Sequence, residues 1–246
     1  MRMRWLLWLN QHFTGRLLTA AVVITGTFQV YGWLNEHLPP RFDFYTPLDA
    51  AIPFLPWTHP VYMSFFLLLM VAAWQLDARE FVRMLGAVLV MDAVCFLGFI
   101  LFTAHYPRPD VESIASPYWR EEFRWMWSRD GPGNTFPSLH VAATVLGTLR
   151  LRRRRGGNGW VVWAALICAS TLTVKQHFLV DVLGGIAVAL AVHAVVFREG
   201  RPPAPGTPLR QGRCTCRSPA FSSCCGGDMR GRAMGLLSRA SRFEQG

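Results

Sequence analysis

The sequence predicts an all-α, polytopic membrane protein, a bundle of six transmembrane helices with both termini in the cytoplasm. The 246-residue chain is 52% hydrophobic and only 16% charged, whereas soluble domains average about 25% charged residues. Its apolar residues gather in runs long enough to cross a hydrocarbon core of ~30 Å. Its arginines concentrate between alternate runs, as the positive-inside rule requires of a polytopic protein.

Six apolar runs are the expected spans. Five of them cover residues 17–34, 60–76, 84–104, 159–174 and 178–197. The sixth, 138–151, is short, and becomes long enough if the charge of Arg150 reaches the membrane interface. The first run has no clear small-residue cleavage site, so we expect it to stay as an anchor and not to be removed as a signal peptide.

The positions of the arginines orient the bundle. They precede the first run (Arg2, Arg4, Arg16), separate the second from the third (Arg79, Arg83) and separate the fourth from the fifth (Arg152 to Arg155). These segments are therefore expected in the cytoplasm. The segments 35–59, 105–137 and 175–177 then face outward.

Two regions are expected: a membrane domain over residues 1–197 and a basic, disordered cytoplasmic tail over residues 198–246. The tail is rich in Pro, Gly and Ser, and its nine arginines and three acidic residues give +6 of the net charge of +10. We expect this charge to attract anionic membrane lipids and not nucleic acid. Four tail cysteines (Cys214, Cys216, Cys224, Cys225) have poor spacing for zinc, so no metal or cofactor is expected.

The pair His177 and Asp181 is the most specific polar feature of the chain. The two residues lie four apart where the last span begins, a spacing that places them on one face of a helix. The carboxylate can accept the imidazole N–H and leave the other ring nitrogen as a nucleophile. A polar pair at the membrane interface is the alternative, and two other segments favour the catalytic interpretation.

Those two segments are the start of the fourth span and an arginine upstream of it. The span opens with Pro137, Ser138, Leu139 and His140, where free backbone N–H groups suit a phosphate and His140 can protonate a leaving oxygen. A simple helix cap is the alternative. Prolines flank Arg108 and stiffen its backbone, which favours bidentate phosphate binding over a mere headgroup contact.

In this order the segments resemble the type 2 phosphatidic acid phosphatase superfamily, over about residues 45–197. The family pattern is Lys-x6-Arg-Pro, Pro-Ser-Gly-His and Ser-Arg-x5-His-x3-Asp. It is matched here at 108–109, at 137–140 and at Ser170, His177 and Asp181, while Leu101, Leu139 and Thr171 replace the lysine, the glycine and the second arginine. The surviving pattern is similar to the branch related to inositol phosphorylceramide synthases, as is the segment 46–53.

The resemblance implies a membrane-embedded, metal-independent lipid phosphate phosphatase. His177, oriented by Asp181, would attack phosphorus and form a phosphohistidine, and His140 would act as acid and then as base. The residues expected to hold the phosphate are Arg108, Ser138, Leu139 through its N–H, and Lys175, the only lysine of the chain.

The expected substrate is a phosphate carried by a lipid, and the site faces outward. One lysine against 24 arginines is typical of a GC-rich bacterial genome, so we expect the inner membrane and a site facing the periplasm. Two related alternatives stay open: a phosphotransferase that delivers the phospho-headgroup to an alcohol, and a silent lipid-phosphate binder that lacks the missing cations. A haem-binding electron carrier and a transporter that uses Asp92 are rivals of other classes.

Overall fold

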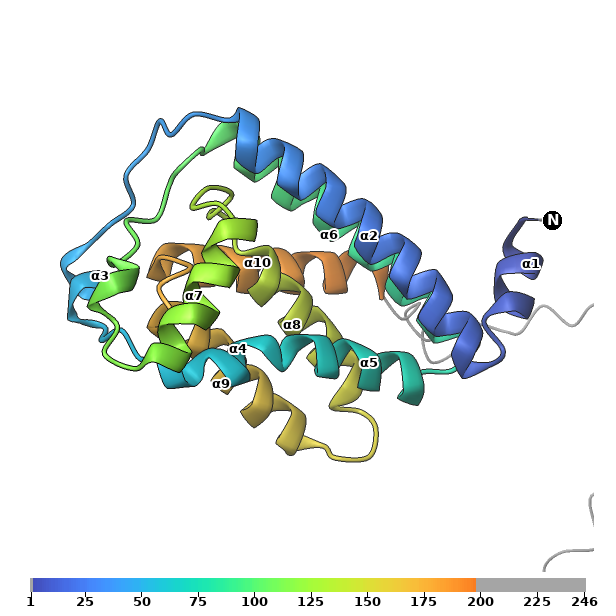
Figure 1. Cartoon of the computed structure of the whole chain (residues 1–246). Helices are drawn as coiled ribbons and strands as arrows, with labels where there is room; N and C mark the ends of the chain where they lie inside the picture. Colours follow the sequence, from blue (N-terminus) through green and yellow to red (C-terminus); the bar gives the residue numbers. More distant parts are fainter. Residues whose placement is uncertain (1, 198–246) are drawn as a thin grey trace, which may run out of the picture. The chain divides into compact units, whose positions relative to one another are not determined.

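The chain was analysed as a computed structural model, which describes residues 2–197. All six apolar runs are helical, and the second is divided into two helices (Figure 1). These helices are α2 (Phe13–His37), α4 and α5 (His59–Met63 and Phe65–Gln75), α6 (Ala78–Leu101), α8 (Leu139–Leu151), α9 (Asn158–Thr173) and α10 (Leu179–Val196). Shorter helices are α1 (Arg2–Leu9), α3 (Pro47–Ala51) and α7 (Pro117–Arg129), with single 3-10 turns at Pro56–Thr58 and Val111–Ser113. The predicted tail and its cysteines lie outside the described residues.

Four of these segments are long and apolar enough to cross a membrane: Phe13–His37, Pro56–Gln75, Ala78–Leu101 and Leu179–Val196. The helices α8 and α9 are apolar but shorter. The prediction of an all-helical protein is therefore confirmed for the described residues, and four of its segments are candidate membrane spans. The count of six spans and the side on which the termini lie stay predictions.

Local capping explains where the predicted boundaries differ from the observed ones. The helix α6 begins six residues earlier than predicted because the Asp77 side chain accepts the Glu80 N–H at 2.9 Å and caps its N-terminus. The second run is interrupted at Ser64, whose hydroxyl donates to the carbonyl of Val61 at 2.6 Å. This break gives α4 and α5 in place of one continuous helix.

The helix α8 lies at the centre of the bundle and packs against α5, α6, α9 and α10. Small residues on it allow this close approach, because Ala142, Ala143 and Gly147 are all buried and carry little side-chain volume. The helix α2 packs against α5 and α6 at the edge of the bundle. A hollow therefore remains among α2, α5, α6 and α8.

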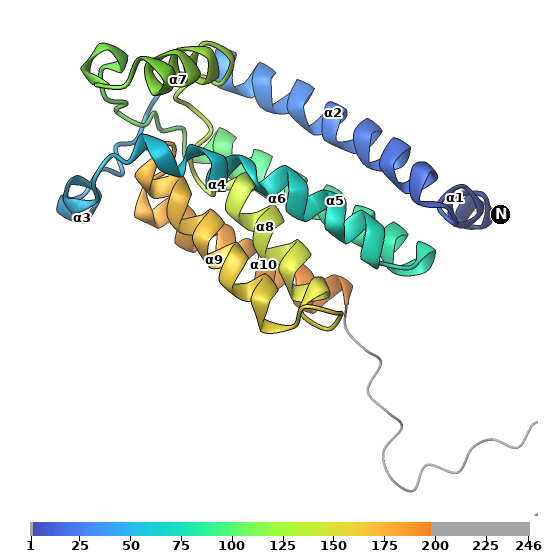
Figure 2. The same cartoon turned by 60° about the horizontal axis from the view of Figure 1, so that its bottom comes forward.

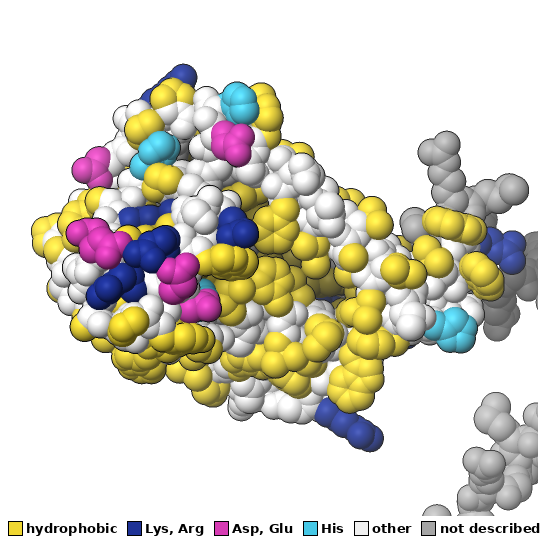
Figure 3. Space-filling view, viewed as in Figure 1, with side chains coloured by type: hydrophobic (Ala, Val, Ile, Leu, Met, Phe, Trp, Pro, Cys, Tyr) yellow, Lys and Arg dark blue, Asp and Glu magenta, His cyan; other side chains and the backbone are white. Residues whose placement is uncertain are grey.

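The helix α7 lies across one end of the bundle, within the segment 105–137 that was predicted to face outward (Figure 2), and its last residues line the hollow. Its buried Phe123 and Met126 pack in one cluster with Val174, Phe54 and Tyr62. Its outer face carries charged side chains, while hydrophobic side chains surround the hollow between α2 and α5 (Figure 3). The helix α7 is therefore amphipathic, with its apolar side packed on the bundle and its charged side exposed.

Candidate active site

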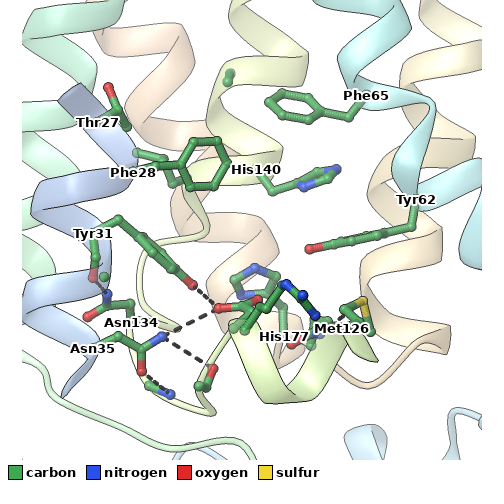
Figure 4. Close-up of a pocket in the computed structure, with 18 of the residues that line it drawn as sticks. Thr27, Phe28, Tyr31, Asn35, Tyr62, Phe65, Met126, Asn134, His140 and His177 are labelled. Carbon is green, nitrogen blue, oxygen red and sulfur yellow. Dashed lines mark hydrogen bonds between the residues drawn. The ribbon is translucent and has the colours of Figure 1, made fainter. Parts of the chain in front are cut away.

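A cavity of about 560 Å³ occupies the hollow, and His140 and His177 both line it (Figure 4). Its walls within the bundle are apolar and include Ile24, Phe28, Phe65, Phe66, Leu69, Val88, Met91 and Ala143. Polar lining residues gather beneath α7 and the segment after it, and include Tyr31, Asn35, Tyr62, Asp130 and Gln176. The cavity thus has one polar end and one apolar body, as a site for an amphiphile would.

Glycines bring the two histidine segments together. A Cβ on Gly185 of α10 would lie 2.6 Å from the carbonyl oxygen of Ser138, and one on Gly98 of α6 would lie 2.3 Å from Pro137 Cδ. Only glycine leaves room for these contacts. The Ser138 N–H then donates to the carbonyl of Asp181 at 3.0 Å. The starts of α8 and α10 are joined directly by this bond.

His177 lies just before α10 and not within it, because Phe178 is the N-cap residue. Its Nδ1 is 3.4 Å from Asp181 Oδ2, and the same oxygen accepts the Phe178 N–H at 2.8 Å. The predicted contact is present, although it arises from a carboxylate that reaches back over the helix start and not from a shared helix face. This arrangement directs Nδ1 to Asp181 and leaves Nε2 for a substrate.

The segment 46–53, which precedes the second run, forms hydrogen bonds with the residues on either side of His177. The Lys175 ammonium donates to the carbonyls of Asp49 and Ile52 at 3.0 and 2.5 Å, and burial lowers the pKa of Lys175. Asp49 Oδ1 accepts the Leu179 N–H at 2.7 Å. These contacts direct Lys175 toward the α3 segment, and its predicted role in holding phosphate stays a prediction.

The ring of His140 stacks on Tyr62 and packs at a tilt against Phe65 (Figure 4). Its centroid is 4.3 Å from that of Tyr62, with an interplanar angle of 15°, and 4.2 Å from that of Phe65. Its Nε2 is buried and has no hydrogen-bond partner among the residues that the structure describes. His140 is also one of the residues that line the cavity.

Ser138 is the N-cap of α8, which was the alternative reading of this residue. Its Oγ accepts the Val141 N–H at 3.2 Å, and the residue is fully buried. The side chain of Leu139 lines the cavity. The structure thus gives the Ser138 hydroxyl a capping contact, and the phosphate contacts of Ser138 and of the Leu139 N–H stay predictions.

Arg108 lies behind the polar wall of the cavity. Its Nη1 donates to the carbonyl of Asp130 at 2.6 Å, and its Nη2 donates to the carbonyl of Gly131 and to Gln176 Oε1 at 2.8 and 2.7 Å. Burial lowers the pKa of Arg108, and the Asp130 carboxylate, 4.0 Å away, acts in the opposite direction. Since its three partner residues line the cavity, a phosphate would reach the guanidinium by replacing them.

Sequence reasoning missed the polar network that closes this wall. The Tyr31 hydroxyl donates to Asp130 Oδ1 at 3.0 Å, and the Asn35 amide donates to the carbonyl of Gly131 at 3.3 Å. Burial raises the pKa of Asp130. The signal that could have found the network is the presence of polar side chains in and just after the first apolar run, where they are costly unless they have a partner.

The two positions that lost the expected cations lie apart from this network. Leu101 is 54% exposed, and Thr171 is buried, with its hydroxyl donating to the carbonyl of Cys168 at 2.7 Å. Across residues 2–197 no three His, Cys, Asp or Glu side chains gather as metal ligands. Two guanidinium groups lie near the polar end of the cavity: Arg129, which lines it and lies over the Trp125 ring at 4.4 Å, and Arg108, which lies behind the wall.

A family model described as the PAP2 superfamily matches residues 54–195, more than half of the chain. The chain belongs to the PAP2 superfamily. The predicted resemblance is thus confirmed, and the matched region contains Arg108, His140, His177 and Asp181. The helix α2 lies outside it, so this PAP2 protein builds one wall of its cavity from residues that the family model does not cover. Comparisons with curated proteins and with solved structures found no match.

Proposed function

We propose that this PAP2 protein is a lipid phosphate phosphatase embedded in the membrane, which works through a phosphohistidine on His177. The observation that carries the proposal is that His140 and His177 line one cavity with a polar end and an apolar body. The contact between His177 and Asp181 supports the nucleophile, since it fixes which ring nitrogen is free.

In the first step the Nε2 lone pair of His177 attacks phosphorus, and the bond from phosphorus to the lipid oxygen breaks. Protonated His140 gives its proton to that oxygen, so the lipid leaves as an alcohol. In the second step His140 removes a proton from a water molecule, which attacks the phosphohistidine. The P–N bond breaks, phosphate leaves, and both histidines return to their starting state.

Charge on the phosphate is offset by Arg108 and by the backbone N–H groups at the start of α8. Arg108 now donates to two carbonyls and one amide oxygen. The incoming phosphate takes over two of these donors, which is the bidentate geometry that a guanidinium favours. The wall formed by residues 130–131 then moves away from the guanidinium as the substrate binds.

The lipid reaches the cavity sideways, between α2 and α5. Phe28 and Phe66 both line the cavity, and their rings stack 6.4 Å apart. The two residues are also 51% and 42% exposed. They serve as the apolar entrance for the acyl chains. The proposal includes six spans, an outward-facing site and a bacterial inner membrane.

A phosphotransferase is the second candidate, in which an alcohol replaces water in the second step. The observation that favours it is the segment that resembles the synthase branch: Asp49 and Ile52 in that segment bind the turn that carries His177. A part of the chain similar to synthases thus supports the nucleophile directly.

The test is phosphate release by the detergent-purified protein from a panel of lipid phosphates, with EDTA present and with His177→Asn as the control. Release that disappears in the variant supports the phosphatase. Consumption of lipid phosphate only after a lipid alcohol is added, with a new phospholipid formed, supports the transferase. A folded protein that binds these lipids and turns over none of them would contradict both.

A further inference from the structure

A polar side chain, that of Asp92, lies among the apolar residues that line the body of the cavity. Asp92, in the middle of α6, lines the cavity and is only 4% exposed. The Thr27 hydroxyl of α2 donates to Asp92 Oδ2 at 2.6 Å. The other carboxyl oxygen, Oδ1, is buried and has no hydrogen-bond partner in the part of the chain that the structure describes.

A carboxyl group at this position is costly, and a contact between two helices does not require it. Placing an acidic group inside a span costs several kcal/mol unless partners satisfy it. Joining α2 to α6 uses one of its two oxygens, while the neighbouring lining residues Phe28, Val88 and Met91 are apolar. The residue lines the cavity, and within the described residues Oδ1 has no hydrogen-bond partner.

The position of Asp92 relative to the polar end follows from α2. Thr27, its partner, lies one helical turn before Tyr31, which binds Asp130. Four residues of helix correspond to a rise of about 6 Å. A lipid with its phosphate at His177 therefore passes Asp92 with the part of its backbone or chain that follows the headgroup.

We propose that Asp92 and Thr27 form a second binding point of the substrate site, at which Asp92 Oδ1 accepts a hydrogen bond from the lipid. The donor is a hydroxyl or an amide N–H carried on the chain beyond the phosphate. The inference rests on the proposed function and narrows the substrates to phosphorylated lipids that carry such a donor. It also gives α2, which the family model does not cover, a part in substrate selection.

The test uses single-chain alkyl phosphates of one length, either unsubstituted or with one hydroxyl or one amide group at successive positions. For the wild-type protein, kcat/KM for at least one substituted isomer should exceed that for the plain chain roughly tenfold to hundredfold, as for a buried hydrogen bond to a charged group. The hydroxyl and amide series show which donor is accepted.

The double variant Thr27→Val with Asp92→Leu removes both polar partners and keeps the side-chain shapes, which limits the loss of stability. In this variant the ratio of kcat/KM between the substituted isomer and the plain chain should fall to about one. Thr19→Val is the matched control, because that hydroxyl donates within α2 to the carbonyl of Gly15. This control should keep the preference.

Two results would overturn the inference and leave the proposed function standing. One is a wild-type protein that hydrolyses every isomer and the plain chain equally well. The other is a double variant that loses activity on all of them by the same factor, since Asp92 would then serve folding alone. If no alkyl phosphate is hydrolysed by any protein, the proposed function fails. Equilibrium binding of the same series, compared between wild type and double variant, then decides the inference.

Discussion

The two histidines of the cavity are held in different ways. His177 lies in a turn fixed by hydrogen bonds to the backbone, and its Nδ1 faces the carboxylate of Asp181. His140 is held by the rings of Tyr62, which stacks on it, and Phe65, which packs against it at a tilt, and its Nε2 has no partner in the described part of the chain. The first arrangement fixes a tautomer and suits a nucleophile. The second fixes the ring position and leaves Nε2 without a protein partner, as a group that exchanges a proton with a substrate would need.

The largest effect should come from His177→Asn. This change removes the nucleophile, and we expect kcat/KM to fall at least about 1,000-fold. The loss should be equal for alkyl phosphates and for nitrophenyl phosphates, because no leaving group can compensate for a missing nucleophile. Comparison of both substrate types on the folded variant checks this. Retention of wild-type activity would contradict the assignment.

His140→Gln should reduce the hydrolysis of alkyl phosphates roughly 100- to 10,000-fold, the usual range for a lost general acid. A nitrophenolate leaving group needs no proton, so phosphorylation of His177 should survive. We therefore expect a burst of nitrophenolate, stoichiometric with protein, followed by slow turnover. Rapid-mixing absorbance measures the burst. A loss that does not depend on the leaving group would assign His140 a structural part instead.

Two buried carboxylates, Asp181 and Asp49, accept hydrogen bonds from the residues around His177 and can be changed as a matched pair. Asp181→Asn removes the group that fixes the His177 tautomer, and we expect kcat to fall roughly 100-fold or more. Asp49→Asn keeps an acceptor for the Leu179 N–H and does not touch the imidazole, so we expect a loss of about fivefold or less. Steady-state kinetics on one lipid phosphate compare the two. Equal losses would mean that the turn, and not the tautomer, is what matters.

The smallest effect should come from the ring that stacks on His140. Tyr62→Leu removes the stacking, which contributes about 0.5–1.5 kcal/mol for an aromatic pair, so we expect a roughly threefold to tenfold loss of kcat on alkyl phosphates. Tyr62→Phe keeps the ring and should stay close to wild type. If Tyr62→Phe were as impaired as Tyr62→Leu, the hydroxyl and not the ring would carry the effect.

The helices and the contact between His177 and Asp181 could be predicted because both follow from short-range patterns. Long apolar runs indicate helices that are buried or lie in a membrane. A spacing of four residues keeps two side chains within contact distance whether or not both lie in the helix. Capping residues then moved individual boundaries, as Asp77 did for α6. These features depend on a few neighbouring residues and are visible in the sequence.

The surroundings of His140 and Arg108 could not be predicted, because they depend on which helices become neighbours. Tyr62 and Phe65 lie in an apolar run like any other aromatic residue, and only the break at Ser64 and the packing of α5 on α8 bring them to His140. The segment that carries Asp130 was predicted only to face outward, and nothing in its sequence shows that its carbonyls accept from Arg108. Hydrophobic periodicity indicates which residues are buried, but it does not indicate which residues of other helices they contact.

The most direct test of the account is to trap the intermediate. The protein would be mixed with a lipid phosphate, quenched in alkali to preserve phosphohistidine, digested and analysed by mass spectrometry. The account predicts phosphate on His177 in the wild-type protein, accumulating further in His140→Gln. Steady turnover with phosphate on another residue, or with no phosphorylated residue at all, would contradict it.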